Sequence, residues 1–91
     1  MSRKYSLLIE IESSKAKEIA ETFDAEYLDG DCDTYQDGNT VTYEGNSWLG
    51  GGQTESAAHH EIVESVKEFD PDAKVKTYWH YLEDWDYKFE N

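Results

Sequence analysis

The chain has 91 residues, and its 21 acidic residues against 8 lysines and arginines give a net charge of −13 at pH 7. This charge disfavours direct binding to DNA, RNA or an anionic membrane, because each of these carries charge of the same sign. No apolar run approaches the roughly 18 residues of a membrane-spanning helix. The length predicts one acidic domain over residues 1–91. The single cysteine, Cys32, excludes an internal disulfide and is typical of the reducing cytoplasm.

The first predicted element is a strand over residues 5–12, YSLLIEIE. Four apolar side chains recur at every second position and would share one buried face: Tyr5, Leu7, Ile9 and Ile11. The short apolar core is flanked by glutamates, which favours a strand over a signal peptide.

A helix is predicted next, with Ser13 or Ser14 as its N-cap. Its apolar side chains have the i, i+3, i+4, i+7 spacing of one helix face: Ala16, Ile19, Ala20 and Phe23. The opposite face carries charged residues, including Glu18 and Glu21, and is expected to face solvent.

A hairpin is predicted between residues 34 and 44. Asp37-Gly38 suits a tight turn that needs positive φ, so strands are expected over 34–36 and 40–44. Gly45-Asn46 then suggests a bulge or second bend before Trp48.

A second helix is predicted after the glycine break GGGQT, with Thr54 as its N-cap. Its apolar stripe is Ala58, Ile62, Val66 and Phe69, and Pro71 ends it. Glycines before a helix also resemble a phosphate-binding turn, but the lysine of a P-loop is missing. A simple strand-to-helix connection is therefore favoured.

The last predicted strand covers residues 73–82, where Val75, Thr77, Trp79 and Tyr81 alternate with polar positions. Residues 85–89 alternate in the same way and form an extra strand or an extended segment packed on the sheet.

The order strand, helix, hairpin, helix, strand predicts an α+β fold of the ferredoxin-like β-α-β-β-α-β type. In this plait an antiparallel sheet has two helices on one face, here with a possible extra C-terminal strand. The other face would show Tyr78, His80 and further aromatic side chains. Such an uncovered face would invite a homodimer.

Four aspartates in YLDGDCDTYQDGNT match positions 1, 3, 5 and 9 of an EF-hand calcium loop: Asp29, Asp31, Asp33 and Asp37. The glycine of position 6 is replaced by Thr34, and the glutamate of position 12 by Thr40. A true EF-hand is therefore disfavoured. The remaining interpretations are a weak cation site, an acidic recognition loop and a solvated connection.

No catalytic set is visible in the sequence. His59 and His60 are neighbours on a predicted helix, where their side chains diverge by about 100° and cannot chelate one metal. Both are expected to be exposed. No histidine is close to Cys32 in the sequence, and no acid and base can be paired. We expect neither an enzyme nor a cofactor.

Seven aromatic or histidine side chains crowd residues 78–89, among the acidic residues Glu83, Asp84 and Asp86. Aromatic rings beside carboxylates complement an arginine-rich protein surface, because arginine stacks on rings and pairs with carboxylates. The alternative is that Trp79, Tyr81 and Trp85 simply fill the core.

The stretch from Thr40 to Phe89, through NSWLGGG, EFDPDAKVK and YWHYLEDW, resembles ferredoxin-like proteins carried by plasmids and phages. In size and charge the chain is also similar to small acidic phage-encoded inhibitors, including many anti-CRISPR proteins. The first resemblance implies the plait, and the second implies a protein that occupies the nucleic-acid path of a basic target. Neither assigns a role to a residue.

The leading hypothesis is a non-enzymatic binding protein that inhibits or regulates a basic, nucleic-acid-binding protein by nucleic-acid mimicry. The candidate contact residues are Asp29, Asp31, Asp33, Glu18, Glu21, Glu64, Glu68, Glu83, Asp84, Trp85 and Asp86. One alternative is a salt-adapted regulatory or interaction domain. Another is a weak divalent-metal module at the Asp29–Asp37 loop, with His59, His60 or His80 nearby.

Overall fold

The structure is a computed structural model that describes residues 3–23, 27–28, 32–81 and 85–90. Its elements in chain order are β1 (Arg3–Glu12), α1 (Ala16–Thr22), β2 (Asp33–Asp37), β3 (Thr40–Leu49), α2 (Glu55–Phe69), β4 (Lys74–Tyr81) and β5 (Trp85–Glu90).

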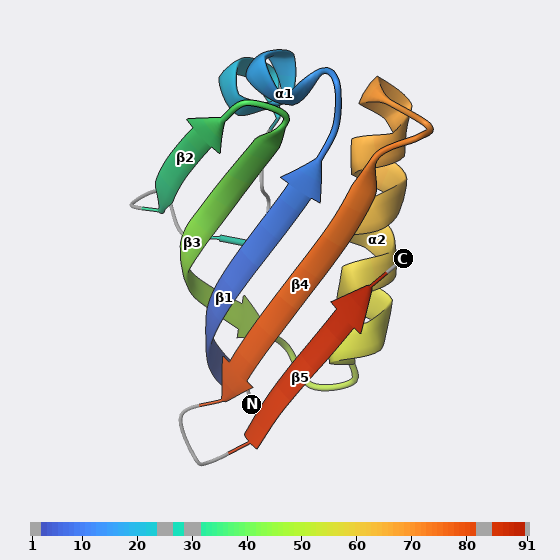
Figure 1. The fold of residues 1–91 in the computed structure, drawn as a ribbon. Coiled ribbons are helices and arrows are strands. Elements are labelled where there is room, and N and C mark those ends of the chain that lie inside the picture. Colours follow the sequence, from blue (N-terminus) through green and yellow to red (C-terminus); the bar gives the residue numbers. More distant parts are fainter. Residues whose placement is uncertain (1–2, 24–26, 29–31, 82–84, 91) are drawn as a thin grey trace.

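The five strands form one open antiparallel sheet in the order β2-β3-β1-β4-β5 (Figure 1). The central strand, β1, pairs with β3 on one side and with β4 on the other. The two hairpins place β2 outside β3 and β5 outside β4, so β2 and β5 form the edges. The predicted α+β class and the extra C-terminal strand are confirmed.

The hydrophobic core lies between one face of the sheet and the two helices (Figure 1). The alternation predicted for β1 is confirmed, because its four apolar side chains from Tyr5 to Ile11 are fully buried. Trp79 of β4 is fully buried as well, and its ring packs edge-on against Tyr5, with ring centres 5.5 Å apart. Burying each large side chain contributes about 1.5–3 kcal/mol, so these rows hold the fold together.

Helix α2 follows its sequence signals closely. Thr54 caps it as predicted, since its hydroxyl accepts a hydrogen bond from the Ala57 N–H at 3.1 Å. Ala58, Ile62 and Val66 are buried as the stripe requires. The helix ends at Phe69, before the proline.

Helix α1 begins later than the sequence predicts. The residue at its N-cap position is Lys15, which makes no side-chain cap. The Ser13 hydroxyl instead accepts from the Lys15 N–H and donates to Asp70 Oδ2 at 2.6 Å. Ser13 therefore joins the start of α1 to the end of α2, a contact 57 residues apart in sequence that no local pattern reveals.

The β2–β3 turn lies one residue later than predicted. Asp37 pairs with Thr40, so the two turn residues are Gly38 and Asn39. Gly38 has φ 58°, a conformation that glycine adopts without steric cost. Asp37 is consequently the last residue of β2 and not part of the turn.

The bulge predicted at Gly45-Asn46 is wrong, because β3 continues through both residues to Leu49 with unbroken pairing to β1. The strand curves before its end (Figure 1). Gly45 serves a close approach instead. A Cβ atom at Gly45 would lie 2.9 Å from Cys32 Cβ, closer than side chains pack. Within the described residues, neither helix has the length and apolar composition that crossing a membrane requires.

Candidate partner-binding surface

The structure describes some of the predicted contact residues and not others. Asp29, Asp31, Glu83 and Asp84 lie outside the described residues, and only the backbone of Trp85 is described. The other predicted carboxylates are all exposed: Asp33, Glu18, Glu21, Glu64, Glu68 and Asp86.

The exposed carboxylates do not form one surface. Asp33 begins β2 and Asp86 lies on β5, at opposite edges of the sheet (Figure 1). Glu18 and Glu21 belong to α1, and the remaining two belong to α2. Each group must therefore be considered by its own surroundings.

The sheet face away from the helices carries an acidic area at β2 and β3. Strand register sets Asp33 opposite Glu44 on this face, and Asp37 and the ring of Tyr35 lie on the same side of β2. We call these four residues the β2 acidic edge. Among the described residues, no lysine, arginine or histidine forms an ion pair with its three carboxylates.

Tyr35 is 56% exposed and lies between the two aspartates on their strand. All five residues of β2 are exposed, so Tyr35 is not there to fill the core. Tyrosine is a favoured contact residue at protein interfaces, because its ring is large and loses little entropy on binding. An exposed ring between carboxylates suits an arginine, which can stack and pair at once.

The charge changes across the sheet. On the centre of the same face, Glu10 and Glu12 of β1 are register partners of Lys76 and Lys74 of β4. Each acid here lies opposite a base on the next strand, whereas Asp33 of β2 lies opposite the acidic Glu44 of β3.

The β4–β5 edge is balanced by its own contacts. Lys76 Nζ lies 3.7 Å from Glu90 Oε1, and His80 Nδ1 is paired with Asp86 Oδ1. Lys88 Nζ lies 5.9 Å from the ring centre of Tyr78. Asp86 is thus engaged within the chain, whereas Asp33 forms no ion pair with the described residues.

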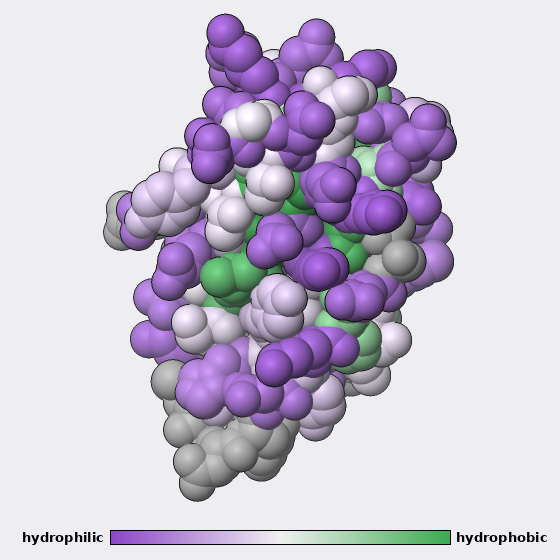
Figure 2. Space-filling view, viewed as in Figure 1, coloured by the Kyte–Doolittle hydropathy of each residue, from purple (hydrophilic) through white to green (hydrophobic). Residues whose placement is uncertain are grey.

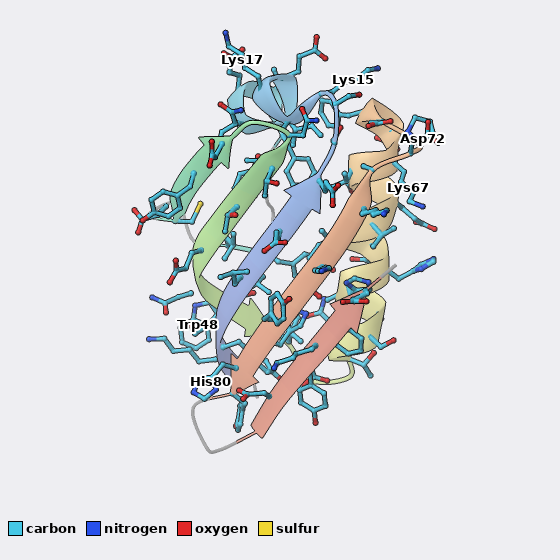
Figure 3. All side chains as sticks on the ribbon, in the orientation of Figure 1. Lys15, Lys17, Trp48, Lys67, Asp72 and His80 are labelled. Carbon is cyan, nitrogen blue, oxygen red and sulfur yellow. The ribbon has the colours of Figure 1, made fainter. Side chains whose placement is uncertain are left out.

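The aromatic side chains divide between core and surface. Trp79 is core, whereas Tyr78 is half-buried on the open face. Trp48, which is 48% exposed on the same face, has Lys4 Nζ at 5.3 Å from its ring (Figure 3). Figure 2 shows this face as mainly hydrophilic with small apolar areas. The homodimer stays a prediction.

The prediction that His59 is exposed is wrong. Its side chain is buried, with Nδ1 2.8 Å from Thr77 Oγ1 and the ring stacked on Phe89 at 5.3 Å. The Trp79 Nε1–H donates to the same hydroxyl at 3.0 Å. Burial, and to a smaller extent His60, lowers the pKa of His59 and so favours the neutral ring at pH 7.

The three histidines lie in separate surroundings. His60 is exposed and pairs with Glu64 at 3.0 Å, one helical turn away, and His80 pairs with Asp86 across the β4–β5 hairpin. The described residues hold no group of three or more histidine, cysteine or acidic side chains that could bind a metal. Asp33 and Asp37, four residues apart on a strand, are about 13 Å apart and cannot share an ion. The metal module stays a prediction for calorimetry to test.

A polar hollow of about 230 Å³ lies where β1 ends, lined by Glu12, Ser13, Ser14, Asn39, Asp70, Asp72 and Lys74. Its buried carboxylate, Asp70, accepts from the Ser13 hydroxyl and from the Asp72 N–H at 3.0 Å. These hydrogen bonds, with Lys15 nearby, lower the pKa of Asp70 despite the opposing effect of burial. These hydrogen bonds join the start of α1 to the end of α2, and they already use both oxygens of the Asp70 carboxylate.

The glycine turn before α2 does not offer a free phosphate cradle. The Gly50 N–H donates to Gln53 Oε1 at 2.7 Å, and the Gln53 N–H donates to the Gly50 carbonyl at 3.1 Å. The turn closes on itself, as expected for a connection.

Comparisons with models of known protein families, with curated proteins and with solved structures found no match.

Proposed function

We propose that the chain is a non-enzymatic acidic binding protein that inhibits or regulates a basic, nucleic-acid-binding protein. In this role its carboxylates stand in for the phosphates of DNA or RNA. The observation that carries the proposal is the β2 acidic edge, where three exposed carboxylates share a face with an exposed tyrosine and form no ion pair with the described residues. Carboxylates that form no ion pair with the described residues keep their attraction for a partner's cations.

The overall charge supports the same proposal. The longest dimension of the molecule is 37 Å. A DNA duplex of that length carries about 22 phosphate charges, against the −13 of the chain. The two charge densities are of the same order. A field of this size accelerates encounter with a basic surface and makes association sensitive to salt.

Competition with nucleic acid tests the proposal. The full chain would be titrated into complexes of labelled duplex DNA with a panel of basic DNA- and RNA-binding proteins, at about 50 and 200 mM salt. We expect displacement of the DNA from at least one protein, weakening steeply at the higher salt. Failure to bind any basic protein at the lower salt would overturn the proposal.

A charge-matched pair of variants makes the competition specific. Asp33→Asn with Asp37→Asn removes two charges from the β2 acidic edge, and Asp86→Asn with Glu90→Gln removes two charges from the other edge. Mimicry carried by the β2 acidic edge predicts weaker competition from the first variant only. Equal weakening by both would show that net charge alone is responsible.

We also propose that the fold is a ferredoxin-like plait extended by β5. The order β4-β1-β3-β2 within the sheet, with helices after β1 and β3, supports this description. Nuclear Overhauser contacts between β1 and both β3 and β4 would test it, and contacts between β1 and β2 would contradict it.

Salt adaptation is the second candidate function. It is favoured by exposed carboxylates on both helices, such as Glu21 and Glu68, which are not part of the β2 acidic edge. The helices carry fewer lysines than glutamates: Lys17 is in α1, Lys67 is in α2, and Lys15 stands just before α1 (Figure 3). A salt-adapted chain should become markedly more stable in molar KCl. An unfolding midpoint that stays constant would exclude this candidate.

A further inference from the structure

We infer that β2 is a docking strand, whose outer edge adds an extended segment of the basic partner to the sheet. Arginine or lysine side chains of that segment then lie over Asp33 and Asp37. This inference rests on the proposed function and specifies the surface and the kind of segment that the partner contributes.

The outer side of β2 pairs with no other strand within the described residues. Among the described strands only β3 pairs with β2, and α1 lies against both strands. In a hairpin closed by two residues, every second residue directs its backbone groups toward the neighbouring strand. Because Asp37 pairs with Thr40 at the turn, the backbone groups of Thr34 and Gln36 are expected to face outward. An added strand could pair with these groups.

The side chains select a basic segment. Asp33, Tyr35 and Asp37 occupy every second position and share one face of the edge. Alternate residues of an added strand lie on that same face. A segment with arginine at alternate positions would therefore pair with both carboxylates and stack on the tyrosine ring.

Other occupants fit less well. Two copies of β2 side by side would set aspartates against aspartates, and like charges directly across a strand pair are destabilising. The β5 edge is a poorer match for a basic segment, since Lys88 lies between Asp86 and Glu90 and both acids already have partners. Charge thus favours a basic segment at β2 over a second copy or over β5.

Two isomeric peptides separate strand addition from simple charge attraction. The probe is a capped octapeptide of alternating threonine and arginine, titrated by calorimetry into the full chain at low salt. One isomer is N-methylated on every threonine amide and the other on every arginine amide. In an extended peptide these two sets of N–H groups point to opposite edges, so one isomer keeps the donors that β2 needs. We expect the isomers to differ by about tenfold or more in Kd.

Variants of the chain locate the site. Asp33→Asn with Asp37→Asn should weaken binding of the unmethylated peptide by about tenfold, and Asp86→Asn with Glu90→Gln by less than about twofold. Thr34→Pro removes an outward N–H that Thr34→Ala retains, so only the proline variant should lose binding. If the proline variant fails to fold, the peptide isomers still decide the question.

The inference is overturned if the two isomers bind equally, or if the variants at both edges weaken binding equally. Either result leaves the proposed function standing whenever the chain still displaces DNA from a basic protein. The reverse result is also distinguishable. Isomer-dependent peptide binding without any DNA displacement would keep the docking strand and remove the proposed role in nucleic-acid mimicry.

Discussion

The two edge strands of the sheet are built alike and surrounded differently. Each follows or precedes its inner neighbour through a hairpin, and each carries aromatic and acidic side chains. On β5, Glu90 and Asp86 pair with basic side chains of β4, and Phe89 stacks on the buried His59 of α2. On β2 all five residues are exposed, and the described residues provide its acids with no ion pair.

This difference shows that the acidic residues behind the net charge of −13 play different parts at the two edges. Acids on β5 are balanced by neighbours and their strand packs on a helix, so β5 supports the fold. Acids on β2 repel one another and contribute little to packing. The exposed tyrosine between them is a favoured contact residue at interfaces, which is why we propose that β2 binds a partner.

The largest expected effect compares one aromatic side chain on each edge. Phe89→Ala removes the ring stacked on His59 and should lower the free energy of unfolding by about 2 kcal/mol. Tyr35→Ala removes a side chain that is 56% exposed and should change it by less than about 0.5 kcal/mol. Urea unfolding followed by circular dichroism measures both values. Equal losses would mean that β2 is as structural as β5.

The second prediction concerns the pH dependence of stability, which we expect to come from His59, the side chain stacked on Phe89 of β5. The pKa of His59 in the fold is below its ordinary value of 6.5, because the buried ring is hard to charge. The unfolded chain therefore binds the proton more readily once the pH falls below about 6.5. The stability that neutral His59 contributes is complete above that pH and is lost progressively below it.

The measurement compares urea midpoints of the native chain and of His59→Gln at about pH 7.5 and 5.5. Comparison with the variant is needed because protonation of the many carboxylates also changes stability as the pH falls. We expect the native chain to lose stability relative to His59→Gln at the lower pH. The exposed His60→Gln is the control and should keep most of the native response, because burial is the larger cause of the lowered pKa of His59. A loss of the response in that control instead would contradict the assignment.

His59 also marks the limit of what could be predicted from the sequence. The positions of β1, β4 and the buried stripe of α2 follow from hydrophobic spacing, because one buried face imposes a period of two or of 3.6. Histidine is compatible with either face of a helix. Its burial depends on Thr77 and Phe89, which come from later strands and have no local signal.

The same reasoning explains the errors around β3. Gly45 by itself predicts a bulge or bend, whereas in the structure the strand is continuous and Gly45 leaves room for Cys32, which comes from outside the hairpin. The acidic residues of β2 can be read from the sequence. Which acids lack an ion pair with the described residues cannot be read from it. Glu44 joins Asp33 through register, whereas Asp86 leaves the candidate surface because His80 pairs with it.

The smallest expected effect is on the free energy of unfolding, which should rise when an aspartate is replaced at one edge and fall when one is replaced at the other. Asp33 and Glu44 are both acidic and are direct partners across the β2–β3 pair. Asp33→Asn should relieve their repulsion and raise the free energy of unfolding by about 0.5 kcal/mol at low salt. Asp86→Asn removes the partner of His80 and should lower it by a similar amount or less, since both side chains are exposed.

Salt provides the control for this pair of variants, measured by urea unfolding at about 20 mM and 1 M NaCl. At the higher concentration the Debye length is about 3 Å, so both changes should shrink toward zero. A destabilising Asp33→Asn at low salt would mean that Asp33 has a stabilising partner within its own chain. That carboxylate would then be engaged, as Asp86 is, and the β2 acidic edge would lose the property that makes it a candidate for binding a basic protein.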